Sequence, residues 1–104
     1  MASFNRDMFL VLFSISAGPT YGYAIRKHVQ KLTGGKITLS LAAIYDSLHT
    51  LLHEGFVARV DDVEIEGRPR RHYGITRTGS NTLESEKERR TRESEDLGLT
   101  FVIA

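Results

Sequence analysis

Residues 40–55, SLAAIYDSLHTLLHEG, carry the strongest structural signal in this chain. Ser40 can cap the start of a helix, and Gly55 suits the left-handed residue that ends one. Between them, apolar residues recur at the spacing of a single helical stripe: Leu41, Ile44, Leu48, Leu51 and Leu52. The sequence therefore predicts a short helix that buries this stripe and leaves its opposite face open.

The open face of this helix is small at its leading end and polar further along. It carries Ala42, Ala43, Tyr45, Asp46, His49, Thr50 and His53. Small side chains in a first turn let a helix approach a groove closely, so this helix is a candidate recognition helix. We expect contacts with DNA from this face and from Ser40 at its start.

Two strand-like segments follow the helix, residues 56–63 (FVARVDDV) and 71–75 (RHYGI), and a turn is expected over residues 64–70. A helix followed by a hairpin is the element order of a winged helix-turn-helix. Three arginines, Arg68, Arg70 and Arg71, are expected at the tip and returning edge of the hairpin, where guanidinium groups suit a phosphate backbone.

Two more helices are expected before residue 40. The first is capped by Ser3 or Asn5 and runs to about Ser16, and residues 18–19 (GP) stop it. Thr20 is expected to cap the second. The buried stripe of this second helix is Tyr21, Ile25, Val29 and Leu32.

Two details near the second helix predict further contacts. Gly22 in its first turn costs about 1 kcal/mol relative to alanine, which indicates close packing of another backbone. Residues 36–39 (KITL) are expected to form a short strand that pairs with the hairpin.

The last helix is expected to start at the N-cap Thr76 and to run over about residues 77–97. Residues 84–96 (ESEKERRTRESED) contain no apolar side chain, so the helix is predicted to be solvated. Ion pairs such as Glu86 with Arg89 or Arg90 would support it. The tail, residues 97–104 (LGLTFVIA), is apolar and must dock on another surface.

The first helix is apolar nearly all round, which predicts burial on two sides. It is either a central core helix or one that meets a second subunit with its second stripe. The expected two-fold dimer interface comprises Phe4, Met8, Phe9, Phe13, Leu83, Leu97 and Phe101. An apolar cleft at this junction could hold a flat ligand.

Composition sets broad limits on the class of protein. The chain has 104 residues and a net charge of +1, but residues 1–83 hold ten Lys or Arg against seven Asp or Glu, a local charge of +3. This signal is weak for a nucleic-acid binder. Cysteine is absent, which favours the cytoplasm, and the apolar run 8–15 is too short to span a membrane.

Neither metal binding nor catalysis is expected. His49 and His53 have the spacing of a metal pair but no third ligand is obvious nearby in the sequence. Ser40, His49 and Asp46 are the residue types of a nucleophile, a base and an acid. They all lie on one predicted helix, however, and no glycine elbow or oxyanion hole accompanies them. The sequence therefore predicts no metal, no cofactor and no enzyme.

Several motifs together resemble the PadR family of bacterial transcriptional regulators. They are GPTYGYAI at 18–25, LTGG at 32–35, LSLAAIYDSLHTLLHEGFV at 39–57 and GRPRRHYGITRTG at 67–79. The chain differs from the usual family pattern in two places. Leu41-Ala42-Ala43 replaces Pro-Gly-Thr, and Asp46 replaces a proline.

The resemblance implies a homodimeric winged-helix repressor whose affinity for a double-stranded DNA operator is lowered by a small aromatic or cationic effector. It also implies DNA contacts from Thr20 and Tyr21, from the start of the helix at 40–55 and from the arginine turn. The predicted fold is mainly α with a small β-hairpin. Residues 1–78 would form the winged helix-turn-helix, and residues 79–104 a dimerisation helix and tail.

Two functions remain open from the sequence. One is a ligand-responsive, sequence-specific DNA-binding repressor, which the three arginines and the open helix face favour. The other is a winged-helix module that binds a protein and does not bind DNA. The weak net charge and the acidic last helix are consistent with this second function.

Overall fold

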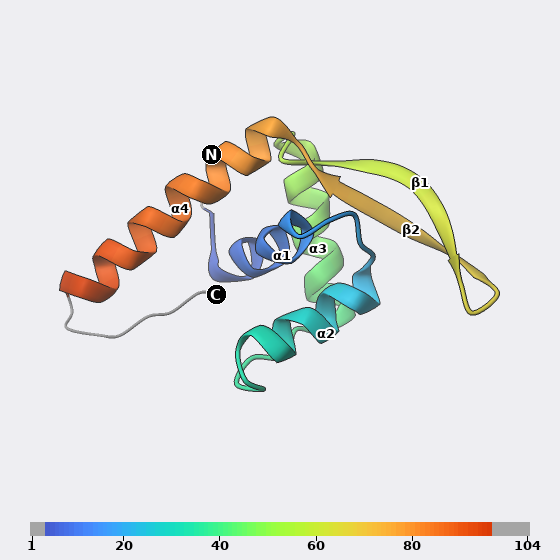
Figure 1. Cartoon of the computed structure of the whole chain (residues 1–104), viewed down its shortest axis with the longest axis horizontal. Helices are drawn as coiled ribbons and strands as arrows, with labels where there is room; N and C mark the ends of the chain where they lie inside the picture. Colours follow the sequence, from blue (N-terminus) through green and yellow to red (C-terminus); the bar gives the residue numbers. More distant parts are fainter. Residues whose placement is uncertain (1–3, 97–104) are drawn as a thin grey trace.

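A computed structural model describes residues 4–96 of the chain, and in them it has four helices and one antiparallel hairpin. The elements are α1 (Arg6–Ser16), α2 (Gly22–Leu32), α3 (Leu41–His53), β1 (Val57–Ile65), β2 (Arg68–Ile75) and α4 (Arg77–Asp96). The hairpin and α4 project to opposite sides of a body made by α1, α2 and α3 (Figure 1). The predicted fold class, mainly α with a small hairpin in winged-helix order, is confirmed.

The central helix of the body is α1, which lies between α4 and the other two helices (Figure 1). Asn5 caps it by accepting a hydrogen bond from the Met8 N–H at 2.9 Å. Val11, Leu12 and Ile15 are fully buried. Within one chain, α1 is therefore already the core helix that the sequence offered as one alternative.

Helix α3 has the predicted caps, but its buried face is rotated from the predicted one. The Ser40 hydroxyl accepts from the Ala43 N–H at 3.1 Å, and Gly55 has φ of 77° just after the helix. Because successive residues turn by about 100°, a buried arc centred on Ile44, Leu48 and Leu51 includes Ser47 and leaves Leu41 at its border. Leu41 is 39% exposed, so its predicted burial is wrong.

Thr20 is not the cap of α2, as the sequence had predicted. The N-cap is Tyr21, whose side chain makes no capping hydrogen bond. The backbone of Thr20 pairs instead with β2. Its N–H donates to the Tyr73 carbonyl at 3.0 Å, and the Tyr73 N–H donates to the Thr20 carbonyl at 2.8 Å. Thr20 thus does the pairing that had been expected of residues 36–39.

Residues 37–40 form no strand. The Thr33 hydroxyl accepts from the Ile37 N–H at 3.1 Å and also lies 3.3 Å from the Ile37 carbonyl. These contacts hold the loop against the C-terminal end of α2, where its backbone groups cannot reach the hairpin. The predicted short strand is therefore wrong.

The hairpin is longer than predicted because its turn is short. Only Glu66 and Gly67 separate the strands, with φ of 51° and 80°, as a two-residue type I′ turn requires. Val60 pairs with His72 and Val63 with Arg70, so a bulge places Asp61 and Asp62 opposite a single residue of β2. The three arginines consequently lie along β2 rather than in a loop.

The start of α4 is fixed to the turn between α3 and β1. The Thr76 hydroxyl accepts from the Gly79 N–H at 3.0 Å, as predicted for an N-cap, and donates to the Gly55 carbonyl at 2.6 Å. A Cβ placed on Gly79 would lie 1.9 Å from the Phe56 carbonyl oxygen. Only glycine lets the first turn of α4 come this close.

Helix α4 is less solvated than its sequence predicted, because its long charged side chains cover α1. Leu83 is buried, Lys87 Nζ lies 5.0 Å from the centre of the Phe13 ring, and Arg90 lies 4.3 Å from the centre of the Phe9 ring. Glu86 pairs with Arg90 and, at 2.9 Å, with Arg89, as predicted.

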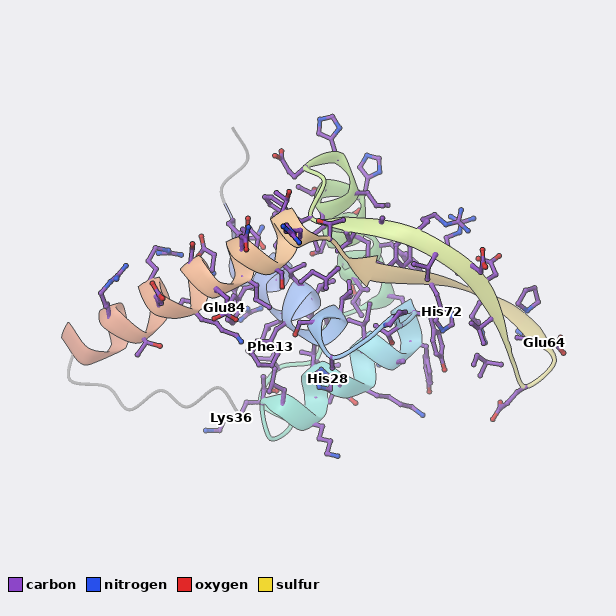
Figure 2. The ribbon with its side chains drawn as sticks, turned by 45° about the horizontal axis from the view of Figure 1, so that its top comes forward. Phe13, His28, Lys36, Glu64, His72 and Glu84 are labelled. Carbon is purple, nitrogen blue, oxygen red and sulfur yellow. The ribbon has the colours of Figure 1, made fainter. Side chains whose placement is uncertain are left out.

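This cover changes the expectation for Phe9. The sequence analysis placed Phe9 and Phe13 at the dimer interface. Phe9, however, is only 2% exposed within the single chain and belongs to its core. Phe13 is half-buried, on α1 (Figure 2). Of the other residues predicted at a dimer interface, Met8 and Leu83 are buried and Phe4 is half-buried, while Leu97 and Phe101 lie outside the described residues.

Candidate nucleic-acid interface

The open face of α3 presents most of the side chains that the sequence had assigned to it. Ala42, Tyr45, Asp46 and His49 are exposed, as is Ser40 just before them, and Ala43 is half-buried. Ala43 and Asp46 also border a cavity of about 260 Å³ between α3 and the first turn of α1. The face therefore has Asp46 on its α1 side and Tyr45 on the side of α2.

Tyr45 lies directly over the start of α2. A Cβ placed on Gly22 would lie 2.8 Å from the Tyr45 hydroxyl oxygen and 2.9 Å from Cζ of the same ring. The close packing predicted at Gly22 is thus confirmed, although the neighbour is a side chain and not a backbone. Tyr45 remains 49% exposed, so one edge of its ring is open to solvent while the other contacts α2.

The residue before Gly22 continues this contact into the hairpin. The rings of Tyr21 and His72 lie 5.1 Å apart between centroids and are tilted by 35°. His72 is 7% exposed and lies where β2 meets α2 (Figure 2). Its Nδ1 lies 2.9 Å from the Arg70 carbonyl oxygen, and since a carbonyl only accepts, Nδ1 carries the hydrogen.

The arginines of β2 divide between the two faces of the hairpin. Side chains alternate along a strand, so Arg68 and Arg70 share the face of His72, whereas Arg71 lies on the other face. Arg68 is exposed. Arg70 is half-buried, and its Nε is buried without a hydrogen-bond partner. Of the three arginines predicted to act together, the structure brings two to the side of α2.

These residues form one region, here called the α3–wing surface. It comprises Tyr45 on α3, Gly22 and Tyr21 at the start of α2, and His72 and Arg70 on β2, with Arg68 further along the same face of β2. Thr20, which the sequence also assigned to DNA contact, anchors this surface from within by its bridge to Tyr73. Three elements far apart in the sequence are thus held together.

The two strands of the hairpin carry opposite charge. β1 bears Asp61, Asp62 and Glu64, and Arg59 on the same strand is tied to Asp62 at 3.0 Å. β2 bears Arg68, Arg70 and Arg71. The positive charge that could meet a polyanion therefore lies on the returning strand.

Residues 4–96 contain no candidate metal site. No group of three or more His, Asp or Glu side chains there could hold a metal ion. His49 and His53 are both exposed on α3. The cysteine-free chain offers no thiolate.

A family comparison explains this combination of elements. Residues 11–85 match the family of PadR-like transcriptional regulators. The chain belongs to the PadR-like family. It is therefore a transcriptional regulator and not an enzyme, and the matched residues include α2, α3 and the hairpin entirely.

Solved PadR-like structures share the fold. A transcriptional regulator from Clostridium thermocellum superposes with a TM-score of 0.78 at 20% identity, covering 88% of this chain and 86% of that one. A PadR-like regulator from Bacillus cereus gives 0.74 at 24% identity, covering 88% and 86%. Bacillus subtilis PadR in complex with operator DNA gives 0.69 at 20% identity, covering 80% of this chain but 47% of that one.

A comparison with curated proteins finds no significant match. Among residues 4–96, no helix is long and apolar enough to cross a membrane. The cytoplasmic location stays a prediction.

Within this PadR-like fold, sequence reasoning missed two residues of the candidate interface. His72 was not among the predicted contact residues, yet it joins α2 to Arg70 of β2. No local signal in the sequence indicates this role, because the contact of His72 with Tyr21 depends on the bridge between Thr20 and Tyr73. Leu41 had been assigned to the core, and only the observed rotation of α3 exposes it.

Proposed function

We propose that this PadR-like chain is a repressor that binds operator DNA through the α3–wing surface. The observation that carries the proposal is a series of neighbours that joins α3 to the wing. Tyr45 packs over Gly22, the preceding Tyr21 stacks on His72, and His72 is hydrogen-bonded to the Arg70 carbonyl. Such a surface offers a helix for the major groove and arginines for the adjoining phosphates at fixed separation. The operator complex of Bacillus subtilis PadR supports the same use of the fold.

The division of labour follows from where the charge lies. Helix α3, Leu41–His53, contains no Lys or Arg and carries Asp46. It contributes little general attraction to a phosphate backbone and is suited to contacts with base edges. Arg68 and Arg70 supply the attraction, and Tyr45 and Tyr21 fix the angle between helix and hairpin.

We propose that the DNA-binding unit is a homodimer with two-fold symmetry. The half-buried Phe13 and the apolar residues of segment 97–104 support an interface built from α1 and residues 79–104. Two-fold symmetry sets two α3 helices toward successive major grooves. The operator would then be an inverted repeat with half-sites about 10 bp apart.

An effector is part of the same proposal. Phe4, Phe9 and Phe13 of the α1 region are already covered by cations of α4, with Arg90 also 5.9 Å from the centre of the Phe4 ring. A flat cationic molecule could take the place of Lys87 or Arg90 over these rings. It would move α4 against α1 and so change the spacing of the two α3 helices. N-Methylquinolinium, a flat aromatic cation, is a suitable probe and is expected to lower DNA affinity.

A gel shift with the DNA upstream of the chain's own gene tests the proposal. The expected result is a complex that survives a large excess of unrelated duplex. If the chain binds neither the upstream DNA nor duplexes selected from a random pool, the result favours the alternative function, a winged-helix module that binds a protein. The gel shift thus separates the two functions.

A further inference from the structure

The first residue of α3 is a large apolar side chain left open to solvent. Leu41 is 39% exposed, although it lies next to the buried arc of the helix. It lies beside the exposed Ala42, and Ser40, just before it, caps the helix. Leu41 and Ala42 together make an apolar end on the part of α3 that would enter a groove first.

The other side chains on this face restrict what the helix can recognise. Arginine and lysine, which pair with guanine O6 and N7, are absent from Leu41–His53. The hydrogen-bonding side chains of the helix that remain exposed are Tyr45, Asp46, His49 and His53, all of them beyond its first turn. A carboxylate such as Asp46 accepts from a base amino group and repels phosphate. At the leading end, the Ser40 hydroxyl caps the helix, and the side chains beside it, Leu41 and Ala42, are apolar.

The one apolar group on the edges of the bases in the major groove is the 5-methyl group of thymine. We propose that Leu41, with Ala42, packs against thymine methyl groups and makes this chain select thymine at one or two positions of each half-site. This inference rests on the proposed DNA binding through α3. It assigns Leu41 as a specificity-determining residue, and it explains why an apolar residue is kept exposed at this position.

The test removes the methyl group from the DNA and its partner from the protein. A random pool of 20-bp duplexes is enriched on the full chain. The bound duplex is then resynthesised with each thymine in turn replaced by deoxyuridine. Affinities are measured by fluorescence anisotropy for the wild-type chain, Leu41→Ala and Val60→Ala. Val60 is a matched control because it is 40% exposed and lies on β1, away from α3.

We expect the wild-type chain to lose affinity about fourfold for each contacted methyl group, since one buried methyl is worth roughly that factor. Leu41→Ala should bind the thymine duplex as weakly as the wild-type chain binds the deoxyuridine duplex, with no further loss on deoxyuridine. Val60→Ala should keep the wild-type loss.

Two results would overturn the inference. In one, no deoxyuridine position changes the affinity of the wild-type chain by twofold. In the other, Leu41→Ala remains as sensitive to deoxyuridine as the wild-type chain, so that another residue reads the methyl. Both leave DNA binding intact. If no duplex is enriched, the proposed function fails and this inference fails with it.

Discussion

Gly22 shows how a single residue can set the geometry of two helices. The ring of Tyr45 occupies the space that any side chain at position 22 would need. The cost of a glycine in a helix is about 1 kcal/mol relative to alanine. Because Gly22 has no side chain, Tyr45 of α3 can pack against α2 while its ring stays 49% exposed.

Gly22→Ala should therefore change DNA affinity far more than it changes stability. The new Cβ displaces only the end of a flexible side chain, and the gain in helix propensity offsets the strain, so the free energy of unfolding should change by less than about 1 kcal/mol. DNA affinity should fall to the level of Tyr45→Ala. Urea unfolding and fluorescence anisotropy measure the two effects.

The double variant supplies the control for this pair. If Tyr45 mediates the effect, Gly22→Ala in the Tyr45→Ala background should cause no further loss of affinity. Losses that simply add would mean that Gly22 acts on DNA independently of the Tyr45 ring.

At the scale of elements, Gly79 fixes how α4 leaves the hairpin. Any Cβ there would lie 1.9 Å from the Phe56 carbonyl oxygen, which belongs to the backbone and cannot rotate away. Gly79→Ala should lower the free energy of unfolding by roughly 3 kcal/mol, at the upper end of the cost of overpacking. The midpoint of urea unfolding measures this change.

Ser80→Ala is the matched control, since Ser80 is exposed in the same turn. Its effect should stay within about 0.5 kcal/mol. If Gly79→Ala were as mild as Ser80→Ala, α4 would not be docked on the turn between α3 and β1 as described.

The elements whose signals are local were predictable from the sequence. The caps Asn5, Ser40 and Thr76 act through side-chain contacts with residues three positions away, so the start of each of these helices could be predicted. The Glu86 pairs are local for the same reason.

Features that depend on distant contacts could not be predicted. The bridge of Thr20 to Tyr73, the rotation of α3 that exposes Leu41, and the stacking of Tyr21 on His72 all require the packed fold. In α4, the charged pattern indicated a solvated helix because sequence periodicity does not register cations that cover aromatic rings.

At the scale of the whole molecule, the proposed dimer depends on residues beyond α4. Cutting the chain after Asp96 removes the apolar segment 97–104 and should shift sedimentation towards the monomer, with loss of operator binding. Phe13→Ser should act in the same direction. Phe9→Ser would not be informative, because Phe9 belongs to the core and its loss would report on folding. A truncated chain that stays dimeric and still binds would exclude residues 97–104 from the interface.

The central claim is that Arg68 and Arg70 hold the DNA backbone beside α3, and the salt dependence of binding tests it most directly. The slope of log affinity against log salt concentration counts the phosphates neutralised, at about 0.9 for each. The variant Arg68→Ala with Arg70→Ala is compared with the wild-type chain and with a double control, Arg59→Ala with Arg77→Ala. That control removes the same number of positive charges, from two exposed arginines.

The predicted result is a slope shallower by about one to two units for the Arg68 and Arg70 variant, with affinity lost on all sequences alike. The slope of the double control should match that of the wild-type chain. Equal slopes for all three proteins would contradict the account, because Arg68 and Arg70 would then hold no phosphate.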